Sequence, residues 1–121
     1  MAAGKARCAR FWPWLALFAG ASGDRNPIHI DLDVAESAGL DDVFAHGMLS
    51  MAYLRRLLAG AFPQHRLRSW KVRFTAITPV HAAPTCTGTV SAIDEVGGER
   101  LAIIDVRVTT DSGVETLLGQ A

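Results

Sequence analysis

The sequence predicts an α+β domain in which an antiparallel sheet wraps around one long central helix. A long apolar run with helix-terminating residues at its end extends from His46 to about Phe62. The residues after this run alternate apolar and polar side chains, which is the two-residue period of β-strands. The 121 residues are enough for one hydrophobic core and too few for a second domain.

The first expected element is a helix over residues 14–19, with Leu15 and Phe18 or Ala19 facing the core. Basic residues precede the apolar run 11–19, so the segment also resembles a secretory signal. Pro13 lies inside this run, which is short for a membrane span, and we therefore favour the helix. We expect residues 1–13 to be an atypical N-terminal segment without a strand, and residues 14–121 to form the single domain.

Two more helices are expected before the strands. Residues 33–38 form a short helix that Asp31 or Asp33 starts and Gly39 stops. The long helix begins at Gly47, runs to about Ala59 and is closed by Gly60 or Pro63. It is apolar nearly all round, so other structure must wrap it.

Four strands should follow, and the last three should form an antiparallel meander. The alternating segments are 69–78, 85–94, 100–110 and 115–120. Glycine-containing turns at 95–99 and 111–113 connect the last three.

Charge and cysteine content exclude several classes of function. Twelve basic and twelve acidic side chains cancel, so no overall field attracts nucleic acid or an anionic membrane. Cys8 and Cys86 have no partner at metal-ligand spacing. We expect two reduced thiols in a cytoplasmic protein that has neither a metal nor a cofactor.

Two short segments point to chemistry. In 23–29 (GDRNPIH), Asp24 precedes His29 by five residues, and Pro27 stiffens the bend between them. In 44–49 (FAHGML), Gly47 opens the long helix, where unpaired N–H groups favour a negative charge. Alone, Asp24 is better explained as a turn cap. Its coincidence with His29 and the helix start favours an acid/base pair that faces an anion-stabilising helix end.

The segments 19–29, 44–49 and 72–80 resemble the MaoC-like hot-dog family, and the resemblance runs from about Leu15 to Ala121. That family contains (R)-specific enoyl-CoA hydratases and (3R)-hydroxyacyl-thioester dehydratases. The resemblance implies a hot-dog fold, with Asp24 and His29 as the catalytic pair and the Gly47 amide as the oxyanion donor. It also implies an acyl-CoA or acyl-carrier-protein thioester as substrate, and a homodimer or a heterodimer with another hot-dog subunit.

The resemblance also suggests the residues that surround the catalytic pair. Asn26, His46 and Met48 are the expected substrate-binding residues. Asn26 matches the motif residue that supports the pair. His46 is expected to pack or cap at the helix start rather than to act as a second base. The long helix's methionines are expected to lie mainly in the core.

Other features leave alternatives open. Arg55 stands where some (R)-hydratases carry a serine, so water would be positioned differently. The basic residues around the first predicted strand form either a solvated sheet face or a contact to the phosphates of coenzyme A or phosphopantetheine; they are Arg66, Arg68, Lys71 and Arg73. The alternative functions are a non-catalytic or partner-dependent subunit of a heterodimeric dehydratase and, with less support, an acyl-CoA thioesterase.

Overall fold

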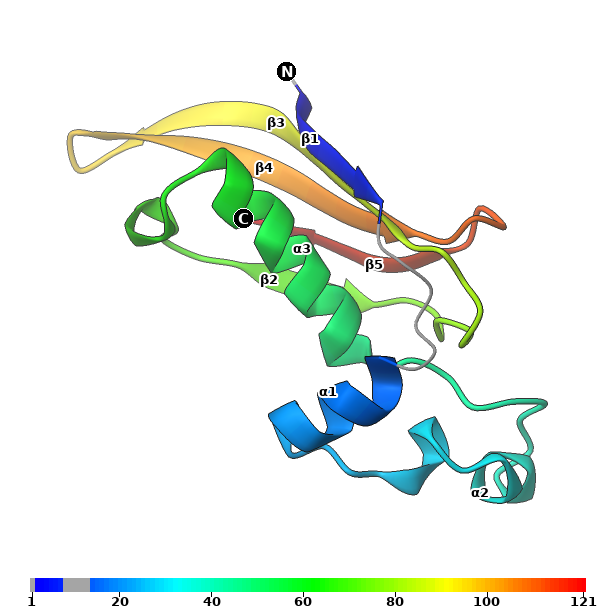
Figure 1. Ribbon diagram of the computed structural model, residues 1–121. Helices are drawn as coiled ribbons and strands as arrows, with labels where there is room; N and C mark the ends of the chain where they lie inside the picture. The colour runs from blue at the N-terminus through cyan, green and yellow to red at the C-terminus, as the bar shows by residue number, and fades with distance from the viewer. Residues whose placement is uncertain (1, 8–13) are drawn as a thin grey trace.

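The computed structural model describes residues 2–7 and 14–121, in which a five-stranded antiparallel sheet curves around helix α3 (Figure 1). The helices are α1 (Trp14–Ser22), α2 (Leu32–Ser37) and α3 (Gly47–Ala61), with short 3₁₀ helices η1 (Pro27–His29) and η2 (Gln64–Arg66). The strands are β1 (Ala2–Arg7), β2 (Lys71–Phe74), β3 (Thr85–Val96), β4 (Glu99–Thr109) and β5 (Glu115–Gln120). Their order in the sheet is β1-β3-β4-β5-β2, so the predicted α+β class and the predicted meander are both confirmed.

The sheet differs from the prediction at its two edges. The prediction of no strand before residue 14 is wrong, because β1 pairs antiparallel with β3, from Ala2 opposite Thr89 to Arg7 opposite Thr85. The segment AAGKAR has few residues that favour strands, so its strand forms through pairing rather than through its own propensity. The predicted domain boundary after residue 13 falls on residues 8–13, which lie outside the described residues, as does Cys8.

The other edge strand, β2, is shorter than the predicted strand over 69–78. After Phe74 the chain leaves the sheet, and Phe44 forms an isolated antiparallel bridge with Pro79. The N–H of Ala45 donates to the carbonyl of Thr78 at 2.9 Å. These contacts hold the segment before α3 in place, which fixes where the helix begins.

The helices follow their expected caps. Leu15 and Ala19 of α1 are buried as predicted. The side chain of Asp31 accepts hydrogen bonds from the N–H groups of Asp33 and Val34 at the start of α2. Gly39 has a φ of +84°, so it supplies the left-handed residue that stops α2.

Helix α3 connects two hydrophobic clusters. The first lies around α1, α2 and the start of α3 and is formed by Leu15, Ala35, Val43, Ala45, Leu49 and Val80. The second lies between α3 and the sheet and is formed by Leu54, Leu58, Cys86, Ile104, Val106, Val108 and Leu117. The side chain of Cys86 is fully buried within this cluster. Since α3 contributes to both clusters, its two ends are held in fixed positions relative to the sheet.

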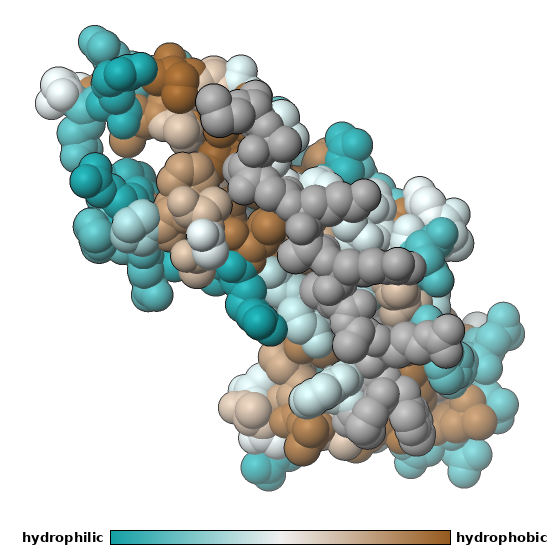
Figure 2. Space-filling model, turned by 45° about the horizontal axis from the view of Figure 1, so that its top comes forward, coloured by the Kyte–Doolittle hydropathy of each residue, from teal (hydrophilic) through white to brown (hydrophobic). Residues whose placement is uncertain are grey.

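Hydrophobic residues also reach the surface. The face shown in Figure 2 intermingles hydrophobic and hydrophilic residues. Met48 and Phe74, near the start of α3, are 55% and 48% exposed. Within the described ranges, every helix is too short or too polar to cross a bilayer.

Candidate active site

The bend between Asp24 and His29 is built from two side-chain-to-backbone hydrogen bonds. The Asp24 Oδ1 accepts the Asn26 N–H at 3.3 Å, and the Asn26 Oδ1 accepts the Ile28 N–H at 3.2 Å. Asn26 thereby caps η1, and Pro27 occupies the first helical position. Asp24 therefore does form the turn contact that was its alternative role, and the same bend directs it toward His29.

The His29 side chain is held in one tautomer. It is 8% exposed, and its Nδ1 lies 2.8 Å from the carbonyl oxygen of Phe44. Because a carbonyl only accepts, Nδ1 carries the proton of the neutral ring. The Nε2 of His29 then keeps a lone pair, as a general base requires.

His46 packs directly behind this arrangement. Its ring stacks on that of His29 with centroids 3.9 Å apart and 29° between the planes. Its Nε2 lies 3.1 Å from the carbonyl oxygen of Asp24, so Nε2 carries its proton. The sequence predicts that His46 packs or caps at the helix start, and the structure shows that it packs. It is the residue before α3, its ring stacks on His29, and its side chain makes no capping hydrogen bond.

Burial keeps His46 neutral. The ring is 1% exposed, and desolvation lowers the pKa of His46 below its usual 6.5, an effect to which the neighbouring His29 adds. The hydrogen bond to the Asp24 carbonyl opposes the shift without overcoming it. His46 is therefore neutral at pH 7, and its Nδ1 has no hydrogen-bond partner among the described residues.

The structure brings the predicted acid and base together. Asp24, His29 and His46 each contribute one ligand-type atom to a group in which all such atoms lie within 4.8 Å of one another. Asp24 is exposed, whereas both imidazoles are buried. The group combines a carboxylate at the surface with an oriented base below it, which suits proton transfer to a bound molecule.

The same three groups are of types that bind zinc. The two imidazole rings stack with only 29° between their planes, so their in-plane lone pairs lie in separate, nearly parallel planes. A tetrahedral ion needs ligand lone pairs that converge on one point. The arrangement fits acid/base chemistry better than a metal centre.

Gly47 is the first residue of α3, where backbone N–H groups have no partner within the helix. A Cβ added here would lie 2.9 Å from Cε1 of Phe74, so the ring of Phe74 lies against this residue. Met48 follows Gly47 and is 55% exposed, which corrects the expectation that it is a core residue. Asn26, another expected substrate contact, is also exposed, whereas the third, His46, is buried.

Sequence reasoning missed three features of this site: the His29–His46 stack, the Phe44 carbonyl and the Phe74 ring. All four residues involved lie within the segments that had already been singled out. Their roles depend on side-chain packing and on a backbone carbonyl, which residue spacing does not encode.

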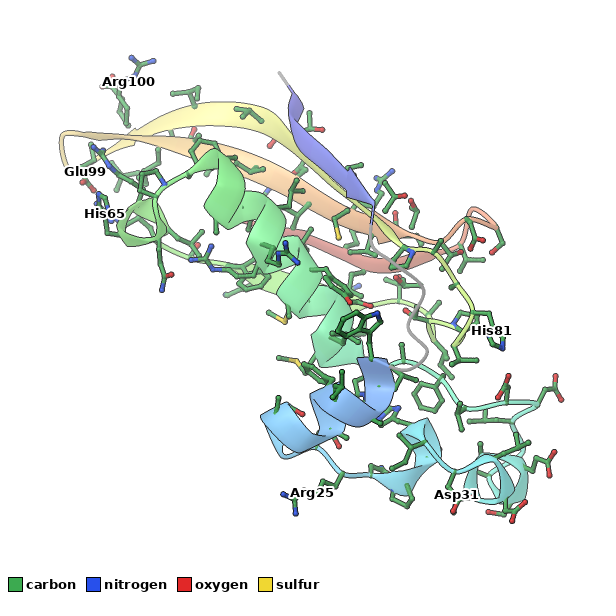
Figure 3. All side chains as sticks on the ribbon, viewed as in Figure 1. Arg25, Asp31, His65, His81, Glu99 and Arg100 are labelled. Carbon is green, nitrogen blue, oxygen red and sulfur yellow. The ribbon has the colours of Figure 1, made fainter. Side chains whose placement is uncertain are left out.

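The basic residues Arg66, Arg68 and Lys71 lie elsewhere, near the C-terminal half of α3. Figure 3 shows this separation: Arg25 and Asp31 lie beside α1 and α2, whereas His65, Glu99 and Arg100 lie at the opposite end, near the β3–β4 hairpin. The acid/base group and the basic cluster therefore occupy different ends of the helix.

Comparison with known proteins agrees with the fold. The R-hydratase PhaJ1 of Pseudomonas aeruginosa superimposes with a TM-score of 0.83 at 27% identity, covering 98% of this chain and 76% of that one. The 3-hydroxyacyl-thioester dehydratase Z of Mycobacterium tuberculosis is 29% identical over 111 residues, covering 82% of this chain and 68% of that protein.

The mitochondrial 3-hydroxyacyl-[acyl-carrier-protein] dehydratase of Arabidopsis thaliana is 33% identical over 76 residues, which are 63% of this chain and 45% of that protein. The chain thus matches less than half of the Arabidopsis protein and about two thirds of the Mycobacterium protein. The family described as MaoC like domain matches residues 14–113. With the hot-dog fold of the R-hydratases and a family match over most of its length, the chain belongs to the MaoC-like domain family.

Proposed function

We propose that the chain catalyses the reversible addition of water to trans-2-enoyl thioesters, giving (R)-3-hydroxyacyl thioesters. The observation that carries the proposal is the position of Asp24 and the tautomer-locked His29 within one 4.8 Å group beside the start of α3. Relatives of the chain are named as hydratases and dehydratases of acyl thioesters, which supports the same reaction class.

In the proposed mechanism, His29 activates the water. Its Nε2 removes one proton as the water oxygen bonds to the β-carbon of the enoyl thioester, a positioned general base being worth about 10²–10⁴-fold. Asp24 accepts a hydrogen bond from the same water. It then receives the proton that His29 has removed and delivers it to the α-carbon, so both side chains return to their starting protonation states. One proton is taken and one is returned, so the net change is the addition of one water molecule.

The negative charge on the thioester oxygen is stabilised at the helix start. As the water bonds to the β-carbon, electrons move through the double bond to the carbonyl oxygen, which becomes enolate-like. The Gly47 N–H, aided by the positive end of the α3 dipole, is the proposed donor to that oxygen. Such a donor is worth about 2.7–4 kcal/mol in the transition state. The lack of a side chain at Gly47 leaves room for the ring of Phe74 beside the helix start.

The test follows the conjugated thioester absorbance on addition of crotonyl-CoA and longer trans-2-enoyl-CoAs. Asp24→Asn should lower kcat/KM by about 10²–10⁴-fold because it removes the proton-transferring carboxylate. The turn should survive, since the amide oxygen of Asn can still accept the Asn26 N–H. His29→Ala should cause a loss of similar size.

The matched control is Asp31→Asn. Asp31 also accepts backbone N–H bonds at a helix start, and the substitution keeps that cap, but Asp31 is not part of the group around His29. It should remain fully active. An inactive wild type with every chain length, or a fully active Asp24→Asn protein, would refute the proposal, and release of free thiol would instead indicate a thioesterase.

A further inference from the structure

A cavity of about 700 Å³ lies at the C-terminal half of α3, beneath the β3–β4 hairpin and η2. Its volume is within the range of small-molecule sites. Aliphatic side chains from α3, the segment after η2 and β4 contribute to its wall, among them Leu58, Leu67, Ile103 and Ile104. The interior therefore suits an apolar chain.

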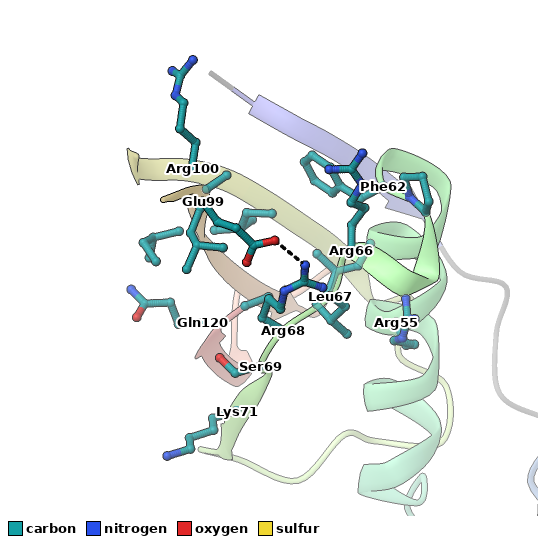
Figure 4. Close-up of a pocket in the computed structure, with 17 residues that line it drawn as sticks. Arg55, Phe62, Arg66, Leu67, Arg68, Ser69, Lys71, Glu99, Arg100 and Gln120 are labelled. Atoms are coloured by element: carbon teal, nitrogen blue, oxygen red, sulfur yellow. Dashed lines mark hydrogen bonds and ion pairs between the residues drawn. The ribbon is translucent and has the colours of Figure 1, made fainter. Parts of the chain in front are cut away.

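The rim of the cavity is strongly basic. Five of the chain's twelve lysines and arginines line it, namely Arg55, Arg66, Arg68, Lys71 and Arg100. Figure 4 shows that these side chains belong to α3, to the segment from η2 to β2, and to the start of β4. The one acidic residue in the lining, Glu99, is paired with Arg68 at 2.8 Å. Because the whole chain has no net charge, this positive excess is local.

Arg55 differs from the other four cations. They are exposed, whereas Arg55 is half-buried on α3. Within residues 2–7 and 14–121, no carboxylate lies at ion-pair distance from Arg55. A half-buried guanidinium without a protein counter-ion is available to pair with an anion supplied by a ligand.

One face of α3 runs from the acid/base group to the cavity. Gly47, Met51, Arg55 and Leu58 are spaced by three or four residues, which places them on one stripe of the helix. Arg55 follows Gly47 by eight positions, or about 12 Å along the helix axis at 1.5 Å per residue. Met51, between them, is half-buried and apolar. An acyl chain that starts with its thioester at Gly47 would follow this stripe into the cavity.

We propose that this cavity receives the distal end of the acyl chain, and that Arg55 pairs with a carboxylate carried there. The preferred substrates are then enoyl thioesters of dicarboxylic acids rather than of simple fatty acids. This inference rests on the proposed hydratase function. The apolar wall suits the methylene groups, and the basic rim stabilises the terminal charge.

The experiment compares two trans-2-enoyl-CoA substrates of equal chain length, one ending in a methyl group and the other in a carboxylate. The wild type should favour the carboxylate substrate in kcat/KM. A charge-assisted contact of this kind corresponds to about a 10- to 100-fold preference. Arg55→Gln should abolish the preference, and Arg55→Lys, which keeps the charge, should retain most of it.

Arg56→Gln is the matched control, because Arg56 is the next residue of α3, is exposed and does not line the cavity. It should keep the wild-type preference. Calorimetry with saturated CoA thioesters of the same two acyl types measures the same discrimination without turnover. This binding comparison tests the cavity even if the wild type hydrates no enoyl thioester, an outcome that would overturn only the proposed function.

Three results would overturn the inference while leaving the hydratase proposal intact. In the first, the wild type shows no preference for the carboxylate substrate. In the second, Arg55→Gln leaves that preference unchanged. In the third, Arg55→Gln weakens the binding of free coenzyme A without changing acyl discrimination, which would make the cavity a phosphate site.

Discussion

Backbone carbonyls set the protonation of both histidines in the candidate site. The Phe44 carbonyl holds the proton of His29 on Nδ1, and the Asp24 carbonyl holds that of His46 on Nε2. The backbone of Asp24 thus contacts His46, while its side chain is the proposed proton-transferring group. We infer that His46 positions the acid and the base by contacting both of them.

The lowered pKa of His46 predicts acid sensitivity of the fold. As pH falls below 6.5, the unfolded chain protonates His46 while the folded chain does not. The folded state then loses stability at up to about 1.4 kcal/mol per pH unit, until the folded ring also binds a proton. Above pH 6.5 the ring is neutral in both states, so the folded state keeps its full stability.

Urea unfolding of the wild type and of His46→Gln between about pH 8 and pH 5.5 measures this effect. Glutamine keeps an N–H donor toward the Asp24 carbonyl but does not titrate. The variant should therefore lose less stability on acidification than the wild type. The comparison at about pH 8, where the ring is neutral in both states, gives the cost of the substitution itself. Equal pH dependence of the two proteins would contradict the assignment.

Among the strands, β2 and β5 approach each other unusually closely at Gly119. A Cβ there would lie 2.7 Å from Cα of Val72 and 2.9 Å from its Cγ1, and it would also meet the Lys71 carbonyl oxygen. Backbone atoms cannot move aside as a flexible side chain can. Glycine is needed at this position because another strand's backbone occupies the space of a side chain.

Gly119→Ala should therefore destabilise the fold by about 1–3 kcal/mol, the usual cost of overpacking. Gly60→Ala is the matched control, since a Cβ at Gly60 in the last turn of α3 meets nothing within 4 Å. That substitution should stabilise by about 0.5–1 kcal/mol, because alanine favours the helix. Denaturant unfolding of both variants checks the two signs, and a neutral Gly119→Ala would contradict the close approach.

The elements differ in how far the sequence predicts them. Helix α2 is predictable because Asp31 and Gly39 mark its ends through local hydrogen bonding and backbone geometry. The meander is predictable because its period and its glycine turns are local as well. Strand β1 is not, because its pairing with β3 is a contact between residues about 80 positions apart.

In the candidate site, too, the local features are predictable from the sequence and the contacts between distant segments are not. The bend from Asp24 to His29 is local and follows from Asn26 and Pro27. The stacking of His46 on His29 and the contact of Phe74 with Gly47 join distant segments, so residue spacing does not predict them. The cavity is missed for the same reason, since α3, β2 and β4 all contribute to it.

For the whole molecule, α3 is the element that links the two proposed sites. Its start carries Gly47 beside the acid/base group, and its second half carries Arg55 and Leu58 in the cavity wall. Both hydrophobic clusters hold this helix, so the distance between the proposed catalytic group and the proposed acyl site is fixed by the fold. Chain-length and end-group preferences should therefore be linked.

The sheet also has an edge at β2, which pairs only with β5 in the described part of the chain. The Thr75 N–H donates to the Thr116 carbonyl at 2.9 Å, so alternate residues of the strand direct their backbone groups toward β5. Val72 and Phe74 then direct theirs outward. Unpaired edge groups beside an exposed Phe74 favour pairing with another strand.

We therefore predict a homodimer joined through β2, with a mass of twice 13.0 kDa by light scattering after size-exclusion chromatography. Phe74→Lys should shift the protein toward the monomer, because it places a charge on the edge strand.

Leu118→Lys is the control: Leu118 is also an exposed apolar residue, but β5 is paired on both sides, so this variant should stay dimeric. Circular dichroism confirms that both variants fold, and a wild-type mass of 13.0 kDa would rule out the dimer. Because Phe74 also lies against Gly47, loss of the dimer should be accompanied by reduced activity.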